Sequence, residues 1–235
     1  MSKKMLKRSL ALGALMAFVI TGQAWAAAEN ITANVTKESI NVADGEVVNG
    51  VESNGYRDAA VYVNAADLTV TGDITIESSK SSNDSGNRLY GIAVTKNSSL
   101  EAKGSTIVNV TGGDITDLRV IRINGEQNNE EAAPKVTFNN LTVNANGNST
   151  VNGIDIWYYG KAVVNGNTNI TVQGVPEGNG TIAAANIGDY SEVEFGGDTT
   201  YLKAVNNGGG VATFFQLGTK QTDVFQFSVA NFVYK

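Results

Sequence analysis

The candidate groups for acid–base chemistry in this sequence are its carboxylates, and its 235 residues include no histidine and no cysteine. Without histidine, the chain has no His-dependent nucleophilic triad and no His-rich zinc site. The acidic residues that could contribute to a site are Asp114, Asp117, Asp155, Asp189, Glu192 and Glu194, with Arg119 and Arg122 near the first two.

Two reactions would use such carboxylates. Glycoside hydrolysis needs two carboxyl groups about 5 to 9.5 Å apart, and calcium-assisted polysaccharide lysis needs several oxygen ligands and a base. No pair of acids is singled out by its spacing, and the acids are spread over predicted turns and faces, as solvated charges would be. We therefore expect no catalytic residue, no metal and no cofactor.

Aromatic residues form the second set of candidates. In the segment Ile154 to Tyr159, alternation with Ile154 and Ile156 inward projects Trp157 and Tyr159 outward. Exposed aromatic rings stack on sugars or anchor protein partners, so Trp157 and Tyr159 are candidate ligand-binding residues. The alternative is that they pack under a neighbouring loop at residues 125–134.

The N-terminus has the three parts of a secretory signal. Basic residues at positions 3, 4, 7 and 8 precede an apolar run from Leu10 to Ile20, and Ala24-Trp25-Ala26 has the small-x-small cleavage pattern. A membrane anchor is the alternative, but a spanning helix needs about 20 apolar residues. We expect a helical signal peptide over residues 1–26, cleaved after Ala26, and export through the inner membrane.

Charge and cysteine content restrict the partners of the exported chain. Removing the signal takes four of the 17 basic residues and no acid, which leaves 13 basic against 23 acidic residues. This balance argues against nucleic acid, since phosphate binding needs clustered Lys and Arg, and against anionic membrane surfaces. The absence of cysteine excludes a small disulfide framework.

Apolar and polar residues alternate over short runs that are bounded by Gly and Asn, which predicts an all-β protein. One short pattern recurs at intervals of 31, 29, 33 and 31 residues, and a period in this range is typical of stacked repeats. Its copies are Val61-Tyr62-Val63, Ile92-Ala93-Val94, Ile121-Arg122-Ile123, Ile154-Asp155-Ile156 and, more weakly, Ala185-Asn186-Ile187.

Each copy is followed by two further short strands in the same order. The second strands are Leu68 to Val70, Leu100 to Ala102, Val136 to Phe138, Ala162 to Val164 and Val193 to Phe195. The third strands are Ile74 to Ile76, Val108 to Val110, Leu141 to Val143, Ile170 to Val172 and Leu202 to Ala204. Three strands per repeat predict a right-handed parallel β-helix of about five triangular coils, stacked about 4.8 Å apart.

Stacking predicts ladders of equivalent residues. Two inward ladders are expected, Val61, Ile92, Ile121 and Ile154, and Val70, Ala102, Phe138, Val164 and Phe195. Tyr62, Ala93, Arg122, Asp155 and Asn186 should form an outward ladder. Arg122 and Asp155 would then be an exposed cross-strand ion pair, worth about 0 to 1 kcal/mol.

The predicted organisation is a β-helix over residues 55–210, with residues 27–54 as a cap or first coil and residues 211–235 as a cap or truncated end. Ile40-Asn41-Val42 is an expected strand in the first of these segments. The polar excursions Glu77 to Asn87 and Gly125 to Pro134 should be outer loops. A β-sandwich is the alternative fold, although it does not account for the ordered strand triplets.

The signal and repeats such as Leu68 to Ile76 and Gly160 to Val172 resemble the passenger region of bacterial autotransporters. That resemblance implies a β-helical passenger at the outer membrane of a Gram-negative cell, or shed from it, often as an adhesin. Such proteins also carry a C-terminal membrane barrel of about a dozen strands, at about 10 residues per strand. The segment after Val211 is too short to supply it.

Two functions follow as expectations. The first is a non-catalytic, secreted or cell-surface interaction protein that binds a host protein, a glycan or a neighbouring cell. The second is a carbohydrate-active β-helix enzyme, which three or more carboxylates with a Lys or Arg in one groove would favour. Self-association through unpaired strand edges is a further expectation.

Overall fold

The strands of the computed structural model pair in parallel, and from β4 to β14 in one sheet the paired residues are 29 to 33 positions apart. The structure describes residues 26–51, 57–79, 88–113, 115–175, 180–208, 212–217, 224–227 and 231–234, the last two ranges as backbone only. The predicted signal sequence lies outside these residues, except for Ala26. Asp114 and residues 80–87, which make up most of the first predicted excursion, also lie outside them.

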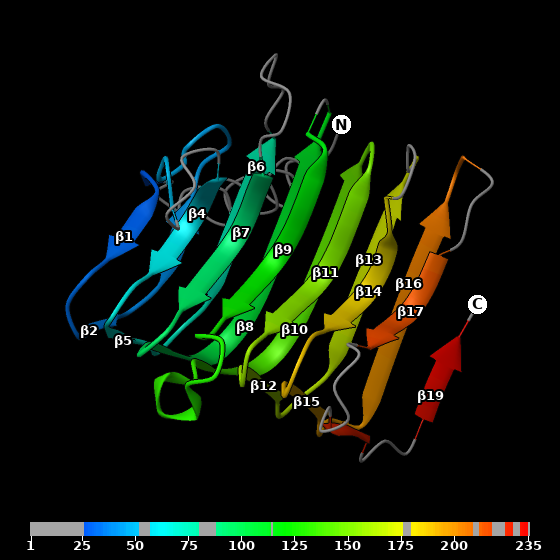
Figure 1. The fold of residues 1–235 in the computed structure, drawn as a ribbon. Helices are drawn as coiled ribbons and strands as arrows, with labels where there is room; N and C mark the ends of the chain where they lie inside the picture. The colour runs from blue at the N-terminus through cyan, green and yellow to red at the C-terminus, as the bar shows by residue number, and fades with distance from the viewer. Residues whose placement is uncertain are drawn as a thin grey trace, which may run out of the picture.

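The described residues form strands joined by short turns (Figure 1). Their bounds are β1 (Glu29–Ile31), β2 (Val35–Lys37), β3 (Ile40–Val42), β4 (Arg57–Val63), β5 (Asp67–Val70), β6 (Ile74–Ser79), β7 (Arg88–Thr95), β8 (Ser99–Gly112), β9 (Asp117–Asn124), β10 (Lys135–Gly147), β11 (Thr150–Trp157), β12 (Lys161–Val164), β13 (Thr168–Gly174), β14 (Ile182–Ile187), β15 (Glu192–Phe195), β16 (Thr199–Asn206), β17 (Ala212–Leu217), β18 (Val224–Phe227) and β19 (Asn231–Tyr234). A short 3-10 helix, η1 (Glu130–Ala132), follows β9. Within the described ranges, no helix has the length and apolar character needed to cross a membrane.

The strands form two sheets. The seven-strand sheet has the order β1-β4-β7-β9-β11-β14-β17, and the twelve-strand sheet holds the other strands. In Figure 1 the seven-strand sheet lies in front, and β8, β10, β13 and β16 lie behind it. Because each strand pairs with its counterpart in the next repeat, the chain is a β-solenoid of about five turns, and the β-sandwich alternative is wrong.

The prediction of three separate strands in every coil is wrong for two coils. The predicted second and third strands are continuous in β8 and in β10. β8 has two residues between Ala102 and Ser105, whereas β10 has one between their partners Phe138 and Asn140. The extra residue forms a bulge, and the strand pairing continues on both sides of it. Gly104 lies at this bulge, where a Cβ atom would approach the backbone of Gly72 to 2.4 Å.

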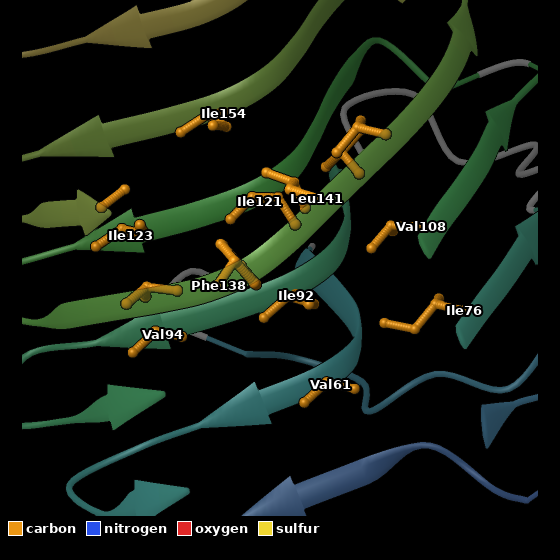
Figure 2. Close-up of a cluster of buried hydrophobic side chains, with 14 of the residues drawn as sticks. Val61, Ile76, Ile92, Val94, Val108, Ile121, Ile123, Phe138, Leu141 and Ile154 are labelled. Atoms are coloured by element: carbon orange, nitrogen blue, oxygen red, sulfur yellow. The ribbon is translucent and has the colours of Figure 1, made fainter. Parts of the chain in front are cut away.

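The predicted inward ladders are confirmed. Val61, Ile92, Ile121 and Ile154 are in register in the seven-strand sheet, and all are fully buried. Val70, Ala102, Phe138, Val164 and Phe195 form the second ladder in the twelve-strand sheet. Figure 2 shows side chains from both sheets meeting in this shared core, among them Ile121, Phe138 and Leu141.

One position in the seven-strand sheet breaks the simple alternation. Val120 and Ile121 are consecutive, yet both belong to the core. Gly91 and Gly153 occupy the position of Val120 in neighbouring strands. A Cβ atom at Gly91 would lie 2.5 Å from the Val108 side chain, and one at Gly153 would lie 2.5 Å from the Ile170 side chain. These glycines therefore let the two sheets approach each other closely.

Polar side chains at the turns connect successive coils. Oδ1 of Asp73 accepts a hydrogen bond from the Ser105 N–H at 2.8 Å, and Oδ1 of Asn140 accepts one from the Asn167 N–H at 2.9 Å. Asn167 in turn accepts from the Thr199 N–H at 3.2 Å. The turn residues thus satisfy backbone donors of the following coil, which explains part of the Asn-rich composition.

The flanking segments continue the parallel pairing. β1, β2 and β3 pair with β4, β5 and β6, and β17, β18 and β19 pair with β14, β15 and β16. β3 coincides with the strand predicted at Ile40 to Val42. The predicted excursion at Glu77 begins too early, because residues 77–79 belong to β6. The Gly125 to Pro134 excursion is a loop with η1 inside it.

Candidate functional site

The outer face of the seven-strand sheet carries the predicted outward ladder. Tyr62, Ala93, Arg122, Asp155 and Asn186 are in register on successive strands. Arg122 and Asp155 form the predicted ion pair. The expectation that this pair is exposed is wrong, since Arg122 is 6% exposed and Asp155 0% exposed.

Burial of this pair comes from a larger network, here called the outer ion-pair cluster: Arg88, Asp117, Arg119, Arg122 and Asp155. Arg119 donates from Nη1 to Asp155 Oδ2 at 2.9 Å and from Nε to Asp117 Oδ1 at 2.7 Å. Arg88 Nε lies 2.6 Å from Asp117 Oδ2. Long side chains on strands about 4.8 Å apart lie over one another, and this contact removes the charges from water.

Asp155 is fully engaged. Its Oδ2 accepts from Arg119 and Arg122, while its Oδ1 accepts from the Trp157 indole at 3.1 Å and from the Asn186 amide. Burial alone would raise the pKa of Asp155, but the charges of Arg122 and Arg119 outweigh it and lower the pKa to about 2. This carboxylate therefore stays ionised and has no lone pair directed at a ligand, which indicates a structural role.

Trp157 is half-buried at the end of β11. Its indole N–H donates to Asp155, and its ring lies against Gly188 of the next coil, where a Cβ atom would come within 2.6 Å of the indole. The ring also meets Tyr158 edge-on, with centroids 5.8 Å apart. The structure thus places Trp157 on the outer face, where it contacts the following coil.

Tyr159 lies beyond the end of β11, so the alternation used to predict its direction does not extend to it. Its ring stacks on Tyr190 of the next coil, with centroids 4.9 Å apart and an interplanar angle of 6°. Tyr158, Tyr159 and Tyr190 all have positive φ, between 53° and 64°. Bulky residues rarely adopt this conformation, and such strained positions are enriched at functional sites.

A groove of about 430 Å³ opens beside this aromatic turn. Its lining residues come from the ends of β4, β7 and β9, from the start of the following loop and from the turn after β11. They are Tyr62, Asn64, Thr95, Lys96, Asn124, Gly125, Glu126, Gln127 and Tyr158. We call this site the tyrosine groove. Two phenol side chains and several amides and hydroxyls line one concave surface, a combination suited to a small polar ligand.

One ion pair lies at the rim of the tyrosine groove. Lys96 Nζ is 2.9 Å from Glu126 Oε1, and both side chains are exposed. The hydrogen bond from Lys96 lowers the pKa of the Glu126 carboxyl, with a further contribution from the Asn129 amide. The pair connects Lys96, directly after β7, to Glu126 in the loop after β9.

Sequence reasoning identified Trp157 and Tyr159 but missed Tyr62 and Tyr158 as groove residues. The sequence predicts that Tyr62 faces outward, but it does not indicate that the loop after β9 lies close to this side chain. Alternation would have turned Tyr158 inward, whereas β11 ends at Trp157 and Tyr158 enters a left-handed turn. The Tyr-Tyr-Gly sequence at 158–160 was the available signal for that turn.

Of the acids considered for catalysis, Asp117 and Asp155 come together on Arg119, and the other described ones lie elsewhere. Asp117 and Asp155 belong to the outer ion-pair cluster, and Glu192 pairs with Lys161 at 3.0 Å on β15 and β12. Glu194 lies farther along β15, Asp189 lies in the turn after β14, and Asp114 is outside the described residues. Among the side chains that the structure describes, no three acids come close enough together to hold a metal ion.

Comparison with protein-family models, with curated proteins and with solved structures finds no match to this chain.

Proposed function

We propose that this chain is an exported, non-catalytic interaction protein that uses the tyrosine groove to bind a glycan on another cell. It would act at the surface of a Gram-negative cell or after release from it, as an adhesin of the autotransporter-passenger type. The β-solenoid is compatible with such a passenger, and the N-terminal sequence has the parts of an export signal.

The single observation that carries this proposal is that Tyr62 and Tyr158 line the same groove. Phenol rings offer an apolar face to a sugar ring, while their hydroxyl groups remain available to water or ligand. The side-chain amides of Asn64 and Asn124 line the same surface, and their N–H groups can donate to sugar hydroxyls, whereas the Thr95 hydroxyl is buried and bonds to Asn64 Oδ1. A volume of about 430 Å³ falls in the range of small-ligand sites.

The carbohydrate-active enzyme receives less support from the same geometry. A hydrolase needs one carboxyl group that gives up its proton near neutral pH and a second that is open to the substrate. Asp155 is ionised and fully hydrogen-bonded, and Asp117 pairs with Arg88 and Arg119. Glu126 in the tyrosine groove pairs with Lys96, and no second carboxylate is among the described residues that line that groove.

The test uses the full chain, produced with its own signal sequence and purified after export. Binding to an array of short oligosaccharides and to whole cells is measured for the native chain, for Tyr62→Ala and for Tyr158→Asn. Asparagine is chosen at 158 because it tolerates positive φ. We expect each change to lower binding at least tenfold while the circular dichroism spectrum stays that of the native chain.

Trp157→Ala and Tyr159→Ala are the companion variants. Trp157 donates a hydrogen bond to Asp155, and Tyr159 stacks on Tyr190. Both substitutions should therefore lower the stability of the fold more than they weaken ligand binding. Folded Tyr62→Ala and Tyr158→Asn proteins that bind cells and oligosaccharides as the native chain does would overturn the groove as the binding site. Release of products from an oligosaccharide would instead favour the enzyme.

A further inference from the structure

A second surface with a regular pattern lies on the outer side of the twelve-strand sheet, away from the tyrosine groove. Six residues of β10 and β13 form a grid on it, in which each residue of the first strand is in register with one of the second. The pairs are Thr142 with Asn169, Asn144 with Thr171, and Asn146 with Gln173. We call this grid the amide strip.

Two shallow grooves follow the amide strip. One, of about 370 Å³, extends from it to Asn109 and Thr111 on β8, and the other, of about 520 Å³, extends to Tyr201 on β16. β8, β10, β13 and β16 lie next to one another in the sheet (Figure 1). The two grooves together therefore cross four successive coils in the direction of the solenoid axis.

Every residue that lines these two grooves is uncharged. This absence of charge distinguishes the two grooves from the chain as a whole, which has 23 acidic and 17 basic residues. The nearest charges in the same register are Glu77 beside Asn109 and Lys203 beside Thr171, at opposite ends of the row. A ligand along the strip thus meets amides and hydroxyls without a net field that favours either sign of charge.

The hydrogen-bonding groups of the strip are largely available. Asn144 donates to Asn109 Oδ1 at 2.8 Å. Asn146 and Asn169 are exposed, and their side chains form no hydrogen bond with other residues that the structure describes. Each amide offers donors and an acceptor, which can pair with the hydroxyl groups of a sugar in either direction.

The spacing of the strip also suits an extended repeating ligand. Equivalent side chains on neighbouring coils are about 4.8 Å apart, and alternate residues along one strand are about 6.6 Å apart. An extended chain of pyranose sugars presents hydroxyl groups at a repeat close to the first of these distances. Tyr201, next to Asn169 in register, adds an aromatic face at one end of the strip.

We propose that the amide strip binds a neutral, extended polysaccharide that lies across the strands along the solenoid axis. The occupant is neutral because the lining is uncharged, and it is an extended repeating chain because outward amides and hydroxyls lie in register on the neighbouring strands β10 and β13. This site is separate from the tyrosine groove, so the two proposals can fail independently.

The test is affinity electrophoresis of the full chain, purified after export, in native gels that contain one soluble polysaccharide each. The neutral probes are dextran, mannan, laminarin and hydroxyethyl cellulose, and the anionic probes are alginate and polygalacturonate. We expect retardation by at least one neutral probe and none by the anionic probes. The double variant Asn146→Ala/Asn169→Ala should weaken that retardation at least tenfold.

Two controls separate the strip from the groove and from general surface effects. Tyr158→Asn should leave the retardation unchanged, since Tyr158 lies in the other sheet's groove. Thr137→Ala changes an outward residue of β10 that lines neither strip groove, and it should also have no effect. No retardation by any neutral probe, equal retardation of the folded double variant, or preference for the anionic probes would each overturn the proposal.

Discussion

Arg122 and Asp155 lie opposite each other on β9 and β11 and form an ion pair. The pair lies on the outer face of the seven-strand sheet, yet both residues are buried. Asp155 also accepts a hydrogen bond from Arg119, so two guanidinium groups share one carboxylate. Removing one member of a buried ion pair leaves an uncompensated charge, which costs more than the pair itself contributes. The outer ion-pair cluster links β7, β9 and β11, so loss of Asp155 would leave two arginines on β9 without their shared partner.

Replacing Asp155 by Ala should destabilise the fold severely. Two arginines would lose their shared partner, and we expect the free energy of unfolding to fall by about 3 to 5 kcal/mol. Urea denaturation followed by circular dichroism measures this change. Glu194→Gln on the outer side of β15 is the control and should change the free energy by less than about 0.5 kcal/mol. A similar, small loss for both variants would contradict a structural role for Asp155.

The stability that comes from Asp155 should depend on pH in the acid range. Its pKa is lowered from 3.8 to about 2 in the folded state, because the charges of Arg122 and Arg119 outweigh the effect of burial. A lowered folded-state pKa stabilises above the unfolded value and is lost as the pH falls through the folded value. The difference of nearly two pH units corresponds to about 2 kcal/mol.

The measurement is the unfolding free energy of the native chain and of Asp155→Asn at several pH values. Between pH 7 and pH 5 the difference between the two proteins should be constant. From pH 4 to pH 2 it should shrink by about 2 kcal/mol, since the native chain alone loses this contribution. A constant difference down to pH 2 would show that Asp155 does not titrate in this range.

The repeat period allowed the ladders to be predicted from sequence, because one residue of register slip would reverse every side chain. Val61, Ile92, Ile121 and Ile154 follow this rule, and so does the pairing of Arg122 with Asp155. Burial of that pair could not be predicted, since it depends on Arg119 and Trp157 covering the carboxylate together. The alternation along a strand predicts only that a side chain points outward. It does not show whether side chains of the neighbouring coils cover it.

Strand ends limited the prediction of the candidate site. Tyr158 lines the tyrosine groove because β11 stops at Trp157, and no alternation pattern marks where a strand stops. The other wall comes from the loop after β9, about 30 residues earlier in the chain. The tyrosine groove therefore depends on two turns meeting in space, whereas the sequence pattern specified only the strands between them.

Gly153 should not tolerate even one added methyl group. A Cβ atom there would lie 2.5 Å from the Ala184 carbonyl oxygen and 2.5 Å from Ile170 Cγ2. Overpacking of this kind costs about 1 to 3 kcal/mol, and we expect Gly153→Ala to lower the free energy of unfolding by that amount. Gly113→Ala is the matched control, because an added Cβ there meets nothing within 4 Å. Equal stability of the two variants would mean that the sheets can separate at no cost.

Asn140 should stabilise the stack through a single side-chain contact. Its Oδ1 accepts the Asn167 backbone N–H at 2.9 Å, which joins β10 to the next coil. Asn140→Ala removes this acceptor, and a lost hydrogen bond of this type costs about 1 kcal/mol. Asn139→Ala is the control, since Asn139 is exposed and contributes its backbone carbonyl rather than its side chain. Chemical denaturation of both variants distinguishes them.

Thr168 offers the opposite outcome, a substitution that should stabilise the protein. Its hydroxyl is buried in the ladder between Leu141 and Thr200 and has no hydrogen-bond partner among the described residues. Thr168→Val keeps the shape of the side chain and removes the unsatisfied polar group, so the free energy of unfolding should rise by about 1 kcal/mol. Thr171→Val, on the outer side of the same strand, lacks this reason to stabilise. A lower free energy of unfolding for Thr168→Val would contradict this prediction. It would mean that the Thr168 hydroxyl forms a hydrogen bond in the folded protein.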